Sequence, residues 1–137
     1  EVPTEGKPNP KKILNKINSG VNFFQTQYVF DTKILQEYMT ILEDSGVLEK
    51  SFFIIGLGPF MSAKSAKWMN DNLFGVNVPE NIIKRLEQAS DAKQESKKIC
   101  QELINKFKDI KGVKGIHLMG HNKEEEISEI IQEAKKN

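Results

Sequence analysis

The 137-residue sequence has little of several features that mark particular classes of protein. Its one cysteine, Cys100, can form neither an intrachain disulfide nor a cysteine-rich zinc site, and we expect it to be an inert core residue in a reducing compartment. There is no apolar run of about 18 residues and no leader with charged, apolar and small regions, so the sequence predicts neither a membrane span nor a secretory signal. We therefore expect a cytoplasmic protein with no membrane partner.

An excess of charge of one sign is also lacking. Twenty basic side chains face nineteen acidic ones, and the formal net charge of +1 provides no field that would concentrate a polyanion. Arg85 is the only arginine. Arginine is the side chain that most often forms bidentate hydrogen bonds to guanine edges and phosphates, so its scarcity argues against nucleic-acid binding. We expect no nucleic-acid partner, and we expect the lysines to be mainly solvated on helix faces.

What the sequence does contain is the composition of one folded domain, with 38% hydrophobic and 28% charged residues. We treat residues 1–137 as this single domain. Because the first residue is Glu1 rather than an initiator methionine, and because the opening ten residues are rich in proline, we expect a processed or truncated part of a longer protein.

Apolar periodicity alternates between helices and short strands along the chain. Caps and turn residues predict helices over residues 10–19, 32–45, 62–73 and 79–89, then from 91 to a point before 112, and over 123–136. Apolar and aromatic runs predict strands over residues 22–30, 51–58 and 115–120. A first helix followed by three β-α units predicts an α/β fold, in which a parallel sheet has its helices packed outside.

Ligands of such folds bind at the C-terminal ends of the strands, here residues 25–28, 56–60 and 119–122. Gln25, Thr26 and Gln27 place polar side chains in an otherwise aromatic strand. Since a buried amide must be hydrogen-bonded, these residues belong either to a structural network or to a ligand site.

The common sequence motifs for metal binding, nucleotide binding and nucleophilic catalysis are missing. His117 and His121 are four residues apart with glutamates close behind, but one lies in a predicted strand and the other in a loop, so we expect no metal site. There is no P-loop, no G-x-S-x-G elbow and no H-E-x-x-H, and we expect no chemistry by a protein nucleophile.

Four segments resemble the flavin-dependent methylenetetrahydrofolate reductases, in order and at suitable spacing. GVNFFQTQYVFD resembles that family's Thr-Gln strand, particularly in its Gln-Thr-Gln versions, and FFIIGLGPFMSAKSAKWM resembles a later strand with its following helix. FGVNVPENIIKRLE is similar to the family's Gly-Val-x-Val-Pro helix start, and GVKGIHLMGHN to its last strand. The resemblance extends from about Lys11 into the C-terminal helix.

The resemblance implies a (β/α)8 TIM barrel of which this chain supplies only the last three β-α units, since a whole barrel needs about 200 to 250 residues or more. In the family, the absent part holds the acidic proton donor and most contacts to the cofactor, FAD. We therefore expect no activity from this chain alone. The partners implied are the folate substrate and the N-terminal half of the barrel, in the same polypeptide or in a second chain. An electron-donating subunit is a further candidate partner, and an oligomer is expected.

The resemblance also assigns roles to residues. It implies that Gln27, with Thr26 beside it, hydrogen-bonds the pterin of the folate, and that Lys16, with Lys12 and Asn9 as weaker matches, holds the flavin. The family's stacking aromatic residue falls on Met69, with Trp68 next to it. At the end of the third strand, the substrate side includes His121 and Lys123, and Lys123 is expected to pair with the glutamate tail of folate.

Two hypotheses follow. In the first, the chain is the folate-facing wall of an oxidoreductase that reduces 5,10-methylenetetrahydrofolate to 5-methyltetrahydrofolate. In the second, it is a non-catalytic pterin-binding or assembly subunit that completes the barrel of another chain. An upstream segment with the acidic and flavin-contact motifs would favour the first.

Overall fold

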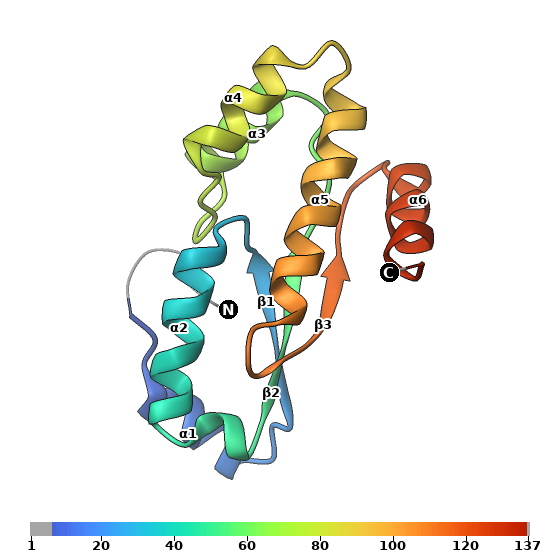
Figure 1. The fold of residues 1–137 in the computed structure, drawn as a ribbon. Coiled ribbons are helices and arrows are strands. Elements are labelled where there is room, and N and C mark those ends of the chain that lie inside the picture. Colours follow the sequence, from blue (N-terminus) through green and yellow to red (C-terminus); the bar gives the residue numbers. More distant parts are fainter. Residues whose placement is uncertain (1–6, 137) are drawn as a thin grey trace.

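The computed structural model describes residues 7–136 as a three-stranded parallel sheet with six α-helices (Figure 1). The order of strands and helices agrees with the order predicted from the sequence, and one short 3-10 helix is additional. The elements are α1 (Pro10–Asn18), β1 (Phe23–Tyr28), α2 (Thr32–Asp44), η1 (Val47–Glu49), β2 (Phe52–Leu57), α3 (Ala63–Asn72), α4 (Glu80–Gln88), α5 (Ala92–Lys108), β3 (Val113–Leu118) and α6 (Glu124–Ala134).

Local capping explains where the helices begin. The Asn9 side chain accepts a hydrogen bond from the backbone N–H of Lys12, and Pro10 follows as the first helical residue of α1. Asp31 caps α2 in the same way, Ser62 forms a capping box at α3, and Asp91 caps α5. These four caps are the ones that the sequence predicted.

The strands lie in the order β1-β2-β3 and both pairings are parallel, which confirms the α/β prediction. This is the arrangement of three neighbouring β-α units of a barrel. Within the described residues, β1 and β3 each have one edge that no other strand covers. The third strand begins at Val113, two residues before its predicted start. The Gly112 carbonyl already accepts a hydrogen bond from the Phe53 N–H, so pairing with β2 starts directly after the turn.

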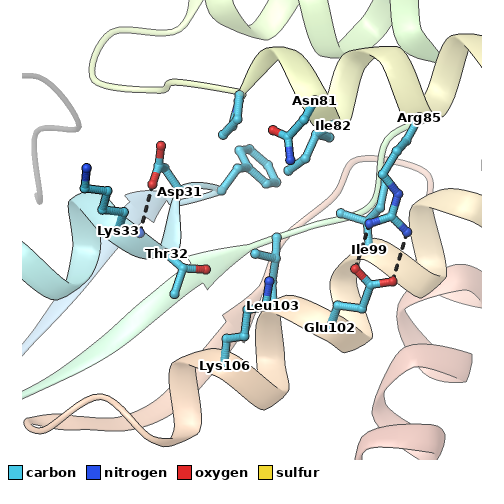
Figure 2. Close-up of a pocket in the computed structure, with 12 residues that line it drawn as sticks. Asp31, Thr32, Lys33, Asn81, Ile82, Arg85, Ile99, Glu102, Leu103 and Lys106 are labelled. Carbon is cyan, nitrogen blue, oxygen red and sulfur yellow. Dashed lines mark hydrogen bonds and ion pairs between the residues drawn. The ribbon is translucent and has the colours of Figure 1, made fainter.

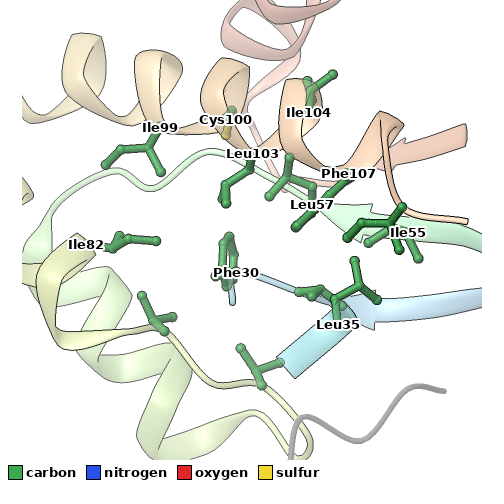
Figure 3. Close-up of a cluster of buried hydrophobic side chains, with 14 of the residues drawn as sticks. Phe30, Leu35, Ile55, Leu57, Ile82, Ile99, Cys100, Leu103, Ile104 and Phe107 are labelled. Atoms are coloured by element: carbon green, nitrogen blue, oxygen red, sulfur yellow. The ribbon is translucent and has the colours of Figure 1, made fainter. Parts of the chain in front are cut away.

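One face of the sheet forms the hydrophobic core. Ile55 and Leu57 of β2 are fully buried, and Figure 3 shows them beside Phe107 of α5 and Leu35 of α2. Cys100 also lies in this core, as expected, and burial raises the pKa of its thiol to about 12. The thiol is therefore protonated and unreactive at neutral pH.

Among residues 7–136, little covers the other face of the sheet. Alternate residues of a strand point to opposite faces, so Phe52, Ile54 and Gly56 of β2 face away from the core. Phe23 and Phe52 stack on each other there and are still 48% and 36% exposed. Residues of this open face can therefore meet a ligand or another part of a barrel.

The loop after β2 closes tightly onto the end of β3. A Cβ atom at Gly58 would lie 2.0 Å from the backbone oxygen of Met119, so only glycine fits at this position. Two residues on, the Phe60 N–H donates a 2.6 Å hydrogen bond to the buried hydroxyl of Ser96 on α5. These contacts hold the C-terminal ends of β2 and β3 together, and α3 and α4 lie beyond these ends (Figure 1).

Candidate functional site

A groove of about 500 Å³ lies between α1 and the free edge of β1. We call it the α1–β1 groove. It brings together four of the residues that the sequence predicted for the cofactor and the substrate: Asn9, Lys12, Lys16 and Gln27. Its remaining lining comes from the start of the described chain, α1, β1, α2 and the loop after α3: Lys7, Pro8, Ile13, Phe24, Tyr38, Phe74 and Gly75.

The groove is positively charged. Lys12 and Lys16 are one helical turn apart on α1, so their side chains leave the same face of the helix, and Lys7 lies before it. Among the described residues that line the groove, none is acidic. Burial raises the pKa of Tyr38 to about 12, so its phenol stays neutral and adds no negative charge. This donor set suits an anion such as a phosphate.

Gln27 is half-buried in β1 and uses one end of its amide within the protein. Its side-chain oxygen accepts a 3.0 Å hydrogen bond from the backbone N–H of Tyr28. Within residues 7–136, its amide nitrogen has no hydrogen-bond partner, although the atom is not sealed from solvent. The oriented amide can therefore donate a hydrogen bond to a ligand.

Thr26 is buried and its hydroxyl is fully engaged. It donates to the carbonyl of Gln27 at 2.8 Å and accepts from the N–H of Gly56 at 2.8 Å, where the register between β1 and β2 shifts. Of the two roles that the sequence left open, this hydroxyl has the structural one. Its predicted contact with substrate stays a prediction.

The third polar residue, Gln25, makes a contact that its sequence pattern did not predict. Its amide nitrogen lies 2.6 Å from Nδ1 of His117 on β3, on the open face of the sheet. The two residues are 92 positions apart, so no local pattern could pair them. The available signal was a glutamine and a histidine each within an apolar strand.

The other predicted substrate residues do not line the α1–β1 groove. Met69 packs into the core and is 9% exposed, whereas Trp68 on the same helix is 55% exposed and offers the freer surface for stacking. His121 is exposed after β3. Lys123 is half-buried, and its ammonium donates to the Pro59 carbonyl. Burial lowers the pKa of Lys123, and its side chain is turned toward the β2–α3 loop.

A second, smaller pocket of about 280 Å³ lies between the start of α2, α4 and α5 (Figure 2). Its central charges pair with one another. Arg85 donates two hydrogen bonds to Glu102, and it also binds Glu95. These charges hold α4 against α5.

Within residues 7–136, no three His, Cys, Asp or Glu side chains are grouped so that they could hold a metal ion. In the same part of the chain, no helix has both the length and the apolar character that a membrane crossing requires.

Comparison with known proteins adds a family match and a fold match. A family model for methylenetetrahydrofolate reductase matches residues 6–135. A solved structure with a similar fold is an uncharacterized protein from Clostridium thermocellum, described as binding two copies of 5-methyl-5,6,7,8-tetrahydrofolic acid. The sequences are 21% identical, the TM-score is 0.66, and the match covers 93% of this chain. It covers 47% of the other chain, so this chain spans about half of its length. No curated protein matches the sequence.

Proposed function

Because this chain belongs to the methylenetetrahydrofolate reductase family, we propose that it is the C-terminal half of a flavin-dependent barrel that reduces 5,10-methylenetetrahydrofolate to 5-methyltetrahydrofolate. The observation that carries the proposal is the convergence of Asn9, Lys12, Lys16 and Gln27 on the α1–β1 groove. The folate ligand of the Clostridium thermocellum protein supports a folate-related role. The absent half of the barrel supplies the rest of the site.

The groove fits the anionic part of a flavin dinucleotide. Lys12 and Lys16 would pair with its phosphates. The oxygen of Asn9 already caps α1, and its amide nitrogen, which has no partner among residues 7–136, would donate a further hydrogen bond. When bound, the reduced flavin supplies the hydride that the reaction needs.

On the substrate side, Gln27 would orient the pterin. Its oxygen is held by the Tyr28 N–H, so its amide nitrogen is directed at the ligand without rotating freely. In the reaction, the bond between the bridging carbon and N10 breaks, the carbon gains a hydride to become the N5-methyl group, and N10 takes a proton. The acid that assists ring opening belongs to the absent half of the barrel.

The proposal requires that other strands cover the open edges of β1 and β3. Parallel strands with unpaired edges and an exposed apolar face are uncommon in isolated proteins. The beginning of the barrel, in the same polypeptide or in a partner chain, would pair with both edges and close the cylinder.

The test uses the assembled protein, meaning this chain together with the rest of its barrel. Lys16→Met removes a charge-assisted hydrogen bond worth about 1.5 to 3 kcal/mol, so the flavin dissociation constant should rise about tenfold or more. Because Lys16 is exposed, the melting temperature of the flavin-free protein should hardly change. Lys11→Met is the matched control, since Lys11 is exposed on the same helix outside the groove.

A second experiment tests the proposed contact between Gln27 and the folate substrate. Gln27→Glu loses the amide donor, so folate-dependent reoxidation of the flavin should slow while the flavin content stays near that of the parent protein. Equal flavin binding in Lys16→Met and Lys11→Met, together with equal reoxidation in Gln27→Glu and the parent, would overturn the proposal. Folate binding without any flavin would favour the non-catalytic subunit instead.

A further inference from the structure

A glutamine–histidine pair crosses the open face of the sheet, outside the α1–β1 groove. Gln25 lies on β1 and His117 on β3, and their side chains meet at 2.6 Å above the central strand β2. In the register, Gln25 pairs with Ile54 of β2, and His117 pairs with Gly56. The contact therefore bridges two strands that are not neighbours.

Gly56, the β2 residue that pairs with His117, is tightly surrounded. A Cβ atom at Gly56 would lie 2.6 Å from the Met119 Cε atom and 2.6 Å from the backbone oxygen of Gln27. Met119 follows His117 by two residues, so its side chain lies on the same face. Only glycine therefore fits at this position of β2, which pairs with His117 in the register.

The pair faces away from the helices. Ile55 and Leu57 on β2 are buried in the core, and the positions that alternate with them, including Gly56, belong to the opposite face. Gln25 is exposed and His117 is half-buried, as expected for groups on an uncovered surface. In a closed barrel, this face is the interior.

The placement of the Gln25 amide nitrogen against Nδ1 fits one tautomer of His117. The amide nitrogen of Gln25 donates to Nδ1, so Nδ1 is the acceptor, and a neutral ring carries its hydrogen on Nε2. Within the described residues, Nε2 has no hydrogen-bond partner. The result is an N–H donor on a ring that Gln25 orients at the open face of the sheet.

We propose that Gln25 and His117 form a ligand-positioning pair, in which His117 Nε2–H donates a hydrogen bond to a ring carbonyl or ring nitrogen of a flat heterocycle bound on the open face, while Gln25 holds the imidazole. The inference rests on the proposed function, because pterin and flavin rings both carry such acceptors. His117 touches the ligand, and Gln25 acts through His117 as a positioning residue. The sequence left Gln25 between a structural network and a ligand site, and it gave His117 no ligand role.

The first measurement is the tautomer, which does not depend on activity. Two-bond ¹H–¹⁵N correlation spectra of the assembled protein should show His117 with its proton on Nε2, and loss of the signal in His117→Phe assigns it. In Gln25→Glu, the carboxylate accepts from the ring, so the proton should move to Nδ1. His121, the only other histidine of this chain, is exposed and serves as the internal comparison. A parent ring protonated on Nδ1 would overturn the pairing.

The second measurement is ligand affinity. His117→Phe keeps the ring shape and removes the donor, and Gln25→Met keeps the chain length and removes the amide. Each should weaken binding of 5-methyltetrahydrofolate to the flavin-loaded protein about three- to tenfold, the value of one neutral hydrogen bond. Gln132→Met removes an amide from the exposed face of α6 and should change nothing.

The outcomes separate the two heterocycles and the two proposals. Weaker folate binding with unchanged flavin binding identifies the pterin as the partner of His117. Weaker flavin binding with unchanged folate binding supports the pair and makes the flavin ring its partner. If neither affinity changes in either variant, the pair has no ligand and the inference is wrong. The proposed function would still stand if Lys16→Met and Gln27→Glu behaved as expected.

Discussion

Ser96 is a single buried hydroxyl on which the loop at the end of β2 depends. It accepts the Phe60 N–H at 2.6 Å and is fully buried on α5. The loop carries Gly58 and Pro59, and Pro59 in turn accepts the hydrogen bond from Lys123. Ser96 therefore connects α5 to the C-terminal ends of the strands, where ligands of this fold class bind.

Ser96→Ala should leave the Phe60 N–H buried without an acceptor. Such a group costs about 1 to 3 kcal/mol, so the free energy of unfolding should fall by that amount. Chemical denaturation of the assembled protein measures the change, and Ser128→Ala, at an exposed position of α6, is the control. A loss as small as that of Ser128→Ala would show that water or another group replaces the hydroxyl.

At the scale of elements, α4 and α5 are joined by the only arginine of the chain. Arg85 on α4 binds Glu95 and Glu102, one residue near the start of α5 and one two turns later. The hydrogen bond from Arg85 holds the pKa of Glu102 below its ordinary value. Since the bridge is partly exposed to solvent, its contribution to stability is modest.

This pKa shift predicts how the stability depends on pH. The pKa of Glu102 is lower in the folded state than in the unfolded state, so its contribution is present above the unfolded value and is lost as the pH falls through the folded value. Glu102→Gln should destabilise the protein by less than about 1 kcal/mol at pH 7, and the difference from the parent should shrink below about pH 4. Glu37→Gln, at an exposed position of α2, is the control for general acid effects. A difference that grows on acidification would contradict the assignment.

At the scale of the whole molecule, the sheet has a groove at each free edge. Beside the α1–β1 groove, a second groove of about 420 Å³ lies between β3 and α6, and we call it the β3–α6 groove. Its lining is mainly apolar, and Ile131 of α6 is 40% exposed there. An exposed apolar groove along an unpaired strand edge suits the addition of another strand.

Ile131→Glu should therefore weaken the association of this chain with the rest of the barrel. Covering the exposed 40% of Ile131 contributes about 1 kcal/mol, and a carboxylate buried there would add a desolvation cost, so the association constant should fall about tenfold or more. Sedimentation velocity measures it for two chains, and the free energy of unfolding measures the same loss in one polypeptide. Gln132→Glu adds the same charge on the adjacent, exposed position. If the isolated chain is instead a well-folded monomer that binds no partner, the idea of an incomplete barrel is wrong.

The sequence by itself determined the order of the elements, because the signals for helix ends are local. Asn9, Asp31, Ser62 and Asp91 each cap a helix through backbone N–H groups two or three residues away. The continuous apolar run of β2 likewise identified a buried strand from its own residues. The family motifs led to Gln27 and Lys16, which line one groove. Their contacts with the pterin and with the flavin stay predictions.

Only the tertiary structure decided which polar groups are engaged and which are free, because this depends on residues far apart in the chain. The ammonium of Lys123 donates to the carbonyl of Pro59, 64 positions away. The hydroxyl of Thr26 accepts from the N–H of Gly56, where the register between β1 and β2 shifts. Gln25 and His117 meet because parallel pairing brings β1 and β3 to either side of β2. Burial and hydrogen-bond geometry arise from the packed sheet, and no periodicity in the sequence encodes them.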